Sequence, residues 1–191
     1  MRIGVLALQG AFIEHLDILQ QLEVEALLVR SPGELDSLDG LIIPGGESTT
    51  ISQLMLDFQL MQPVRDLARD GLPILGTCAG MILMAKRTSG SALETLRLMD
   101  MEVKRNAFGR QVDSFETDLV MPVLGEQPFH AIFIRAPIIE KVGPEVEMLA
   151  KLSNGVMPAA RQGRLVAAAF HPELTQDLRF HRYFLDIVAS D

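Results

Sequence analysis

Short apolar runs alternate with amphipathic segments over the first 90 residues of the chain. The runs that predict buried strands, each bounded by glycine, proline or polar residues, lie at 2–8, 27–29, 40–43 and 72–75. The intervening segments carry apolar residues at helical spacing, and one of them extends from Ser48 toward Gly71 with an expected interruption near Pro63. Strands that alternate with helices predict right-handed crossovers and a parallel sheet covered on both faces.

The pattern changes in the second half, where short strands separated by turns replace this alternation. The strands are expected at 96–103, 118–121, 131–134, 146–152, 158–161 and 165–170. They predict antiparallel additions to the sheet, and a final helix over 176–188 is expected to pack back on it. We therefore expect one α/β domain over residues 1–191, with a doubly wound, mostly parallel sheet and antiparallel additions.

Composition narrows the class of function. A net charge of −8 without a basic stripe argues against nucleic-acid binding, which needs clustered lysine and arginine. No apolar run approaches the length of a membrane span, and the run after Met1 is too short for a signal peptide. A single cysteine excludes an intrachain disulfide and suits a reducing compartment, so a cytoplasmic location is expected. The histidines and acids show no metal-ligand cluster.

That single cysteine, Cys78, lies between Gly76 and Gly80, directly after a predicted strand and directly before a helical pattern that extends to Lys86. On such a strand-to-helix turn a nucleophile projects from the end of the sheet, and the glycines admit strained dihedrals and a closely approaching substrate. Cys78 is therefore the candidate nucleophile. A buried structural thiol is the alternative, and the glycine frame argues against it.

A cysteine nucleophile needs a base and a group that orients the base. His171 ends an apolar strand, and Pro172 keeps it extended, so that Glu173, two residues on, can lie beside its ring. A histidine that merely ends a strand beside a solvated glutamate is the plainer alternative. His15 and His181 lie within predicted helices and His130 opens a strand, so these three are weaker candidates.

The oxyanion that forms during attack on a carbonyl needs preorganised donors. The N–H of Ala79, next after the nucleophile, is one candidate. The N–H of Gly46 is the second, because the Gly45-Gly46 turn ends the strand expected beside that of Cys78. The diglycine could equally be a simple turn, and no lysine follows it at the spacing of a phosphate-binding loop.

These motifs resemble the class I, triad-type glutamine amidotransferase family. The matching segments are Glu14-His15 and residues 8–11, 44–50, 76–80, 105–115, 133–137 and 170–174. In many members of this family, the nucleophile is followed by leucine, glycine and then a polar residue. In this chain Cys78 is followed by Ala79, Gly80 and Met81. This departure and the arginine-containing segments favour the branch that supplies ammonia for pyridoxal 5′-phosphate synthesis.

The resemblance implies a flavodoxin-like fold and hydrolysis of L-glutamine to glutamate and ammonia through a thioester on Cys78. His171 would move protons and Glu173 would orient it. The glutamine contacts implied by the resemblance are Gly46, Glu47, Ser48, Arg105, Ile134 and Arg135. It also implies docking to a (β/α)8 synthase subunit in a hetero-oligomer, to which ammonia would pass, and no cofactor for the hydrolysis itself.

The sequence is also compatible with two other functions. One is a standalone cysteine hydrolase of the same superfamily, such as a peptidase or a deglycase. The other is a regulatory or scaffold subunit that keeps the fold without catalysis. The presence of Cys78, His171 and Glu173 argues against the latter.

Overall fold

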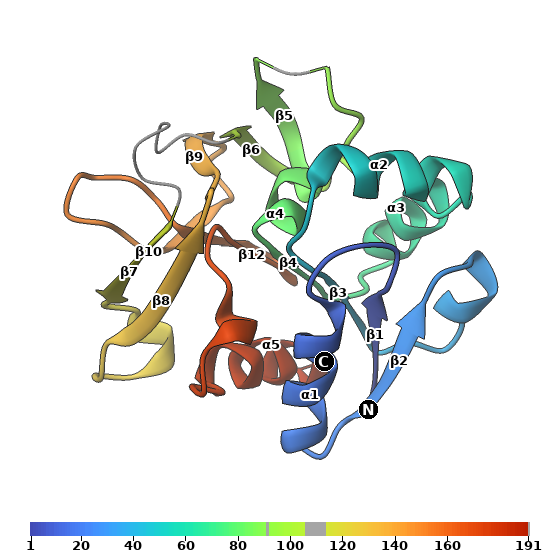
Figure 1. Ribbon diagram of the computed structural model, residues 1–191, viewed down its shortest axis with the longest axis horizontal. Coiled ribbons are helices and arrows are strands. Elements are labelled where there is room, and N and C mark those ends of the chain that lie inside the picture. Colours follow the sequence, from blue (N-terminus) through green and yellow to red (C-terminus); the bar gives the residue numbers. More distant parts are fainter. Residues whose placement is uncertain (91, 106–113, 191) are drawn as a thin grey trace.

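A computed structural model describes residues 1–90, 92–105 and 114–190. Its centre is a seven-stranded sheet in the order β10-β11-β12-β4-β3-β1-β2 (Figure 1). The strands are β1 (Arg2–Leu6), β2 (Glu25–Val29), β3 (Gly40–Ile43), β4 (Ile74–Thr77), β10 (Glu147–Ala150), β11 (Ala159–Gln162) and β12 (Leu165–Ala168). Strands β2, β1, β3, β4 and β12 pair in parallel, and β11 is antiparallel to both of its neighbours. The expected mostly parallel α/β sheet with antiparallel additions is thus confirmed.

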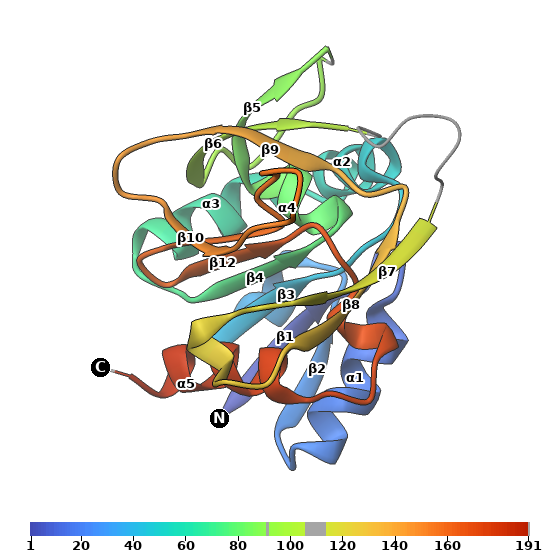
Figure 2. The same ribbon diagram turned by 90° about the vertical axis from the view of Figure 1, so that its left-hand side faces the viewer.

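Helices cover both faces of this sheet. They are α1 (Phe12–Gln21), α2 (Ser48–Asp57), α3 (Met61–Arg69), α4 (Ala79–Met84) and α5 (Arg179–Ala189), with 3-10 turns η1 (Pro32–Leu35), η2 (Pro122–Leu124) and η3 (Pro172–Leu174). Helices α1 and α5 lie on one face and α2 and α3 on the other (Figures 1 and 2). The buried side of α5 carries Phe180, Phe184 and Ile187, as its spacing predicts. None of the helices in the described ranges is long and apolar enough to cross a membrane.

Several strands of the second half form two smaller sheets instead of extending the main one. One contains β5 (Ala85–Ser89), β6 (Met99–Lys104) and β9 (Ile138–Val142), and the other pairs β7 (Ser114–Leu119) with β8 (Phe129–Ile134). The expectation that these short strands all add to the main sheet is therefore wrong for β6, β7 and β8. Strands β5 and β9 were not predicted at all.

Two element boundaries also differ from the expected ones. The break between α2 and α3 lies at residues 58–60, where Gln59 has a positive φ of 57°. Pro63 lies within the first turn of α3, where its missing N–H costs no hydrogen bond. Helix α4 ends at Met84, and Lys86 belongs to β5.

The order of the parallel strands determines where the chemistry can lie. Strands β3, β4 and β12 are neighbours, with Ile43 beside Gly76 and Thr77 beside Ala168. Their carboxyl ends therefore meet at one edge of the sheet, the usual place for a site in an open α/β fold. The loops that leave this edge carry the diglycine turn, the cysteine and the candidate base.

Candidate active site

Cys78 occupies a strained turn between β4 and α4. Its φ is 49° and its ψ is −103°, a region that residues with a side chain rarely adopt. The N–H of Cys78 donates to the carbonyl of Ala168 at 2.7 Å, which anchors the turn to β12. A side chain at Gly80 would overlap the carbonyl oxygen of Ile43, so α4 can pack this closely only with glycine there. The turn presents the thiol at the sheet edge while leaving Cys78 7% exposed.

His171 and Glu173 form a buried pair beside this turn. Nδ1 of His171 lies 2.6 Å from Oε1 of Glu173, and the carboxylate is fully shielded from solvent. Since Glu173 occupies Nδ1, Nε2 is the ring nitrogen that remains to interact with Cys78, which lines the same cavity as His171. The thiol itself lies 3.9 Å from the carbonyl oxygen of Ile134. Cys78 and His171 thus line one cavity, and Glu173 binds the imidazole at its other nitrogen, an arrangement compatible with a catalytic triad.

The environment of His171 favours its protonated form. Burial lowers the pKa of His171, but hydrogen bonds with Cys78 and Glu173 and the charges of both outweigh it and raise the pKa to about 10. A histidine in its protonated form can act as a general acid toward a leaving group.

The diglycine turn after β3 packs against both the cysteine and the histidine. A methyl group at position 45 would overlap Cε1 of His171 and lie 3.3 Å from Cβ of Cys78. The carbonyl of Gly45 accepts from the N–H of Ala11 at 2.9 Å. Because the C=O and N–H of a trans peptide point in opposite directions, the N–H of Gly46 points away from Ala11.

A cavity of about 250 Å³ opens in front of the thiol. It is lined by Gln9, Gly46, Glu47, Ser48, Cys78, Ile82, Arg105, Ile134, Arg135 and His171. All six residues that the family resemblance assigns to glutamine binding line this cavity. Two other predicted site residues do not line it: Glu173 lies behind His171, and Ala79 is the first residue of α4. Segment 105–115, which carries part of the family resemblance, is described only at Arg105 and from Ser114 onward.

Sequence reasoning missed two wall residues, Gln9 and Ile82. Oε1 of Gln9 accepts the backbone N–H of Glu47 at 2.8 Å and so ties the end of β1 to the loop after β3. Ile82 lies one helical turn after Cys78, a spacing that places it on the same side of α4. For Gln9, the sequence offers one indication: it lies in residues 8–11, a segment that resembles the glutamine amidotransferase family.

The charged side chains of the cavity are partly paired with each other. An Nη atom of Arg105 lies 3.0 Å from Oε1 of Glu47. The Glu47 carboxylate also caps α2 by accepting the N–H groups of Thr49 and Thr50, and these bonds outweigh partial burial and lower the pKa of Glu47. Arg135, at a φ of 43°, pairs with no acidic residue in the described part of the chain.

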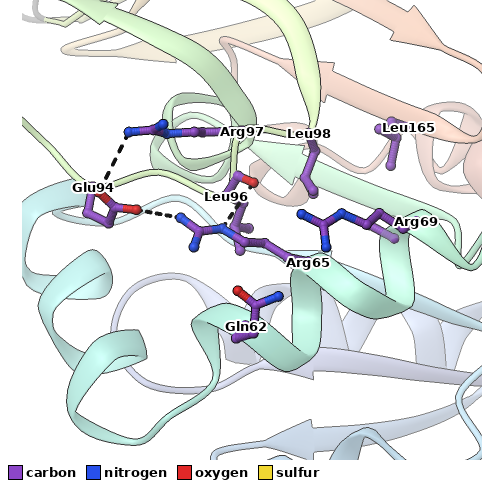
Figure 3. A pocket seen from close by; sticks show the side chains of 9 residues that line it. Gln62, Arg65, Arg69, Glu94, Leu96, Arg97, Leu98 and Leu165 are labelled. Atoms are coloured by element: carbon purple, nitrogen blue, oxygen red, sulfur yellow. Dashed lines mark hydrogen bonds and ion pairs between the residues drawn. The ribbon is translucent and has the colours of Figure 1, made fainter.

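A second cavity, of about 450 Å³, lies between α3 and the segment that precedes β6 (Figure 3). Its guanidinium groups are largely engaged: Arg65 bonds the carboxylate of Glu94 and backbone carbonyls, and Arg69 pairs with Asp66. It holds neither a nucleophile nor a base. Among the described residues, no group of three or more histidine, cysteine or acidic side chains is placed to hold a metal ion.

Solved structures of glutamine amidotransferases have the same fold as this chain. The alignment with a crystal structure of a glutamine amidotransferase covers 98% of this chain and 99% of the chain in that structure. The TM-score is 0.93 and the sequence identity is 46%. A glutamine amidotransferase of Thermotoga maritima gives a TM-score of 0.64 at 15% identity, over 99% of this chain and 84% of its own, which supports the fold alone. The fold is that of the class I glutamine amidotransferases.

The SNO glutamine amidotransferase family matches residues 5–190, and the chain belongs to this family. Two curated relatives carry the name pyridoxal 5′-phosphate synthase subunit PdxT. The protein of Moorella thermoacetica is 58% identical over 188 residues, and that of Herpetosiphon aurantiacus is 60% identical over 190 residues. Each alignment spans 98% of this chain and all of the relative.

Proposed function

We propose that this chain hydrolyses the side-chain amide of L-glutamine to glutamate and ammonia, as one amidotransferase domain over residues 1–191. The observation that carries the proposal is the arrangement of Cys78, His171 and Glu173 at one sheet edge, in a chain of the SNO family. Membership of that family favours glutamine over the peptides and glycated amines of other cysteine hydrolases with this fold. A cytoplasmic location belongs to the same proposal.

The reaction follows from the positions of the three side chains. His171 takes the proton of Cys78 as the sulfur attacks the amide carbon of glutamine. The C–N bond then breaks, His171 returns the proton to the leaving nitrogen, and ammonia departs from a thioester on Cys78. Water, deprotonated by His171, cleaves the thioester and releases glutamate, while Glu173 keeps the ring oriented and stabilises its positive charge.

Backbone donors stabilise the oxyanion, and side chains bind the two ends of the amino acid. The N–H groups of Ala79 and Gly46 are assigned to the oxyanion. Arg135 is suited to the α-carboxylate because it faces the cavity without an acidic partner among the described residues. Glu47 and Arg105 complete the polar wall, with Ser48 and Ile134 beside them.

The ammonia is delivered to a (β/α)8 synthase subunit that makes pyridoxal 5′-phosphate. The names of the relatives support this partner, since both are subunits of pyridoxal 5′-phosphate synthase. We further infer that docking completes the oxyanion hole by reorienting the Gly45-Gly46 peptide. In its present orientation this peptide is held by the bond from Ala11 to Gly45, so contacts with the partner must offset the loss of that bond.

Glutamate release from glutamine, measured with and without a copurified synthase subunit, tests both parts of the proposal. We expect strong stimulation by the synthase subunit. Equal turnover in both samples would contradict the docking step, and turnover of peptides or glycated amines instead of glutamine would contradict the assigned substrate. Cys78→Ala is expected to abolish glutamate release and leave binding of the synthase subunit intact.

A further inference from the structure

Two histidines that the triad does not use are buried directly behind it. His15 comes from α1 and His181 from α5, on the same face of the sheet (Figure 1), and both are fully shielded from solvent. Nδ1 of His15 lies 2.9 Å from Nε2 of His181. Nε2 of His15 lies 3.2 Å from Oγ1 of Thr77 and 3.5 Å from Oε2 of Glu173. His15 therefore stands between the triad carboxylate and the residue that precedes Cys78.

Burial keeps both imidazoles neutral. It lowers the pKa of His15 well below its ordinary value, with further contributions from His181 and His171, and it lowers the pKa of His181 to about 4. A neutral imidazole has one N–H donor and one acceptor nitrogen. The neighbours of each ring therefore determine which nitrogen carries the proton.

The contacts favour one arrangement of these protons. Nδ1 of His181 is buried and has no hydrogen-bond partner in the described part of the chain. An N–H at that position would leave a donor unpaired, so the proton of His181 belongs on Nε2, from which it donates to Nδ1 of His15. His15 must then carry its own proton on Nε2, facing Thr77 and Glu173. The opposite arrangement would leave the His181 donor unpaired and point a lone pair of His15 at the Glu173 carboxylate.

Both groups that face this N–H belong to the site. Oε1 of Glu173 accepts from His171, whereas Oε2 is buried, makes no hydrogen bond with the described residues, and lies 3.5 Å from Nε2 of His15. Oγ1 of Thr77 accepts the N–H of Gly45 at 3.1 Å. One imidazole thus contacts the acid that orients the base and, through Thr77, the diglycine turn.

We propose that His15 is a positioning residue whose Nε2–H faces the free oxygen of Glu173, favouring its carboxylate there by electrostatic attraction, and through Thr77 keeps the N–H of Gly45 in register with the triad. His15 stays neutral, and no proton passes through it. His181 fixes its tautomer by donating to Nδ1. The inference rests on the proposed glutaminase function, because it concerns the positioning of the same three catalytic groups.

Two substitutions separate a positioning role from a merely structural one. His15→Gln keeps an N–H donor at the same number of bonds from the backbone, whereas His15→Leu removes it. In the presence of the synthase subunit, we expect His15→Leu to lower kcat for glutamine about 10- to 100-fold with KM within about twofold. His15→Gln should recover most of that kcat. Equal kcat in His15→Leu and wild type, or equal losses in the two variants, would overturn the proposal.

Thr95→Val is the matched control for the loss of a buried polar group. Its hydroxyl donates to the carbonyl of Ala85 at 2.7 Å, away from the site. We expect this variant to lose thermal stability and to keep its kcat. A similar fall of kcat in Thr95→Val would show that the His15→Leu effect is a general consequence of destabilisation and would overturn the positioning role.

The tautomer provides a test that needs no activity. In the ¹⁵N spectrum of histidine-labelled protein, with the His15 signals assigned by their loss in His15→Gln, we expect protonated Nε2 and unprotonated Nδ1 for both buried rings. A protonated Nδ1 on His15 would overturn the inference even in an active enzyme. Absence of glutamine hydrolysis by the wild-type complex would instead contradict the proposed function, and the spectrum would still decide the tautomer.

Discussion

The backbone of Gly45 lies directly against the imidazole ring of His171. A methyl group at position 45 would overlap Cε1 of the ring and lie 2.9 Å from its Nδ1. Glu173 binds the same Nδ1 at 2.6 Å, so the ring cannot move aside without weakening that bond. The diglycine turn therefore limits the position of the His171 ring.

Replacement of Gly45 by alanine should displace His171 from Cys78. We expect Gly45→Ala to lower kcat for glutamine by about 100-fold, since a displacement of about 1 Å in a catalytic group has an effect of this order. Glutamate release in the presence of the synthase subunit is the measurement. Gly33→Ala is the control, because a methyl group there meets nothing within 4 Å and should leave kcat unchanged. Full activity of Gly45→Ala would show that the ring has room to move.

Glu173→Gln should reduce catalysis without removing side-chain volume. An amide can donate to Nδ1 of His171, which would place the imidazole proton on the nitrogen that faces Cys78. We expect kcat to fall by about 1,000- to 10,000-fold with little change in KM, the size of effect seen when a triad acid is replaced by its amide. The control is Glu102→Gln, whose carboxylate pairs with Lys141 away from the site. A loss of kcat smaller than tenfold would contradict the orienting role.

The main sheet and the positions of the triad motifs could be predicted because their signals are local. Cys78 and His171 each follow an apolar run, and two parallel strands that pair bring their carboxyl ends together. The small sheets could not be predicted in this way. Strand β9 contains Glu140 and Lys141 and pairs with β6, more than 30 residues earlier, so neither its composition nor its neighbours in sequence indicate a strand.

The burial of His15 beside the triad could not be predicted either, because it also depends on contacts between distant parts of the sequence. In the sequence it is one polar residue on an amphipathic helix, and its burial results from packing of α1 beside α5 at the other end of the chain. The ion pair between Glu47 and Arg105 could not be predicted from the sequence either. The family resemblance implies that each contacts glutamine, whereas their mutual contact depends on how the loop after β3 approaches the end of β6.

Protonation of His171 should couple folding stability to pH. Burial opposes the shift, but hydrogen bonds with Cys78 and Glu173 raise its pKa from 6.5 to about 10 in the folded protein. A raised pKa in the folded state contributes stability that is fully present below about pH 6.5 and is lost as pH rises to about 10. We expect the free energy of unfolding to fall across this range in wild type.

Urea unfolding of wild type and His171→Gln at pH 6 and at pH 10 provides the test. The difference between the two proteins should shrink at the higher pH, because glutamine does not titrate. The subtraction removes the pH dependence of groups common to both proteins. A difference that stays constant or grows with pH would show that the folded protein does not favour protonated His171.

Arg135 is the side chain from which we expect the largest effect on glutamine binding. It lines the cavity in front of the thiol without an acidic partner among the described residues, whereas Arg105 is paired with Glu47. Loss of a hydrogen bond between charged groups costs about 1.5–3 kcal/mol, so Arg135→Ala should raise KM for glutamine about 10- to 100-fold. Because the α-carboxylate is remote from the reacting amide, kcat should change less.

The matched control is Arg69→Ala. Arg69 is an exposed arginine on the wall of the second cavity (Figure 3), where it pairs with Asp66, and its removal should leave KM unchanged. Steady-state kinetics with the synthase subunit at saturation would measure both variants under the same docking conditions. If Arg135→Ala kept its KM within twofold while Arg105→Ala raised it, the carboxylate would belong to Arg105, and Glu47 would have to release that guanidinium when glutamine enters.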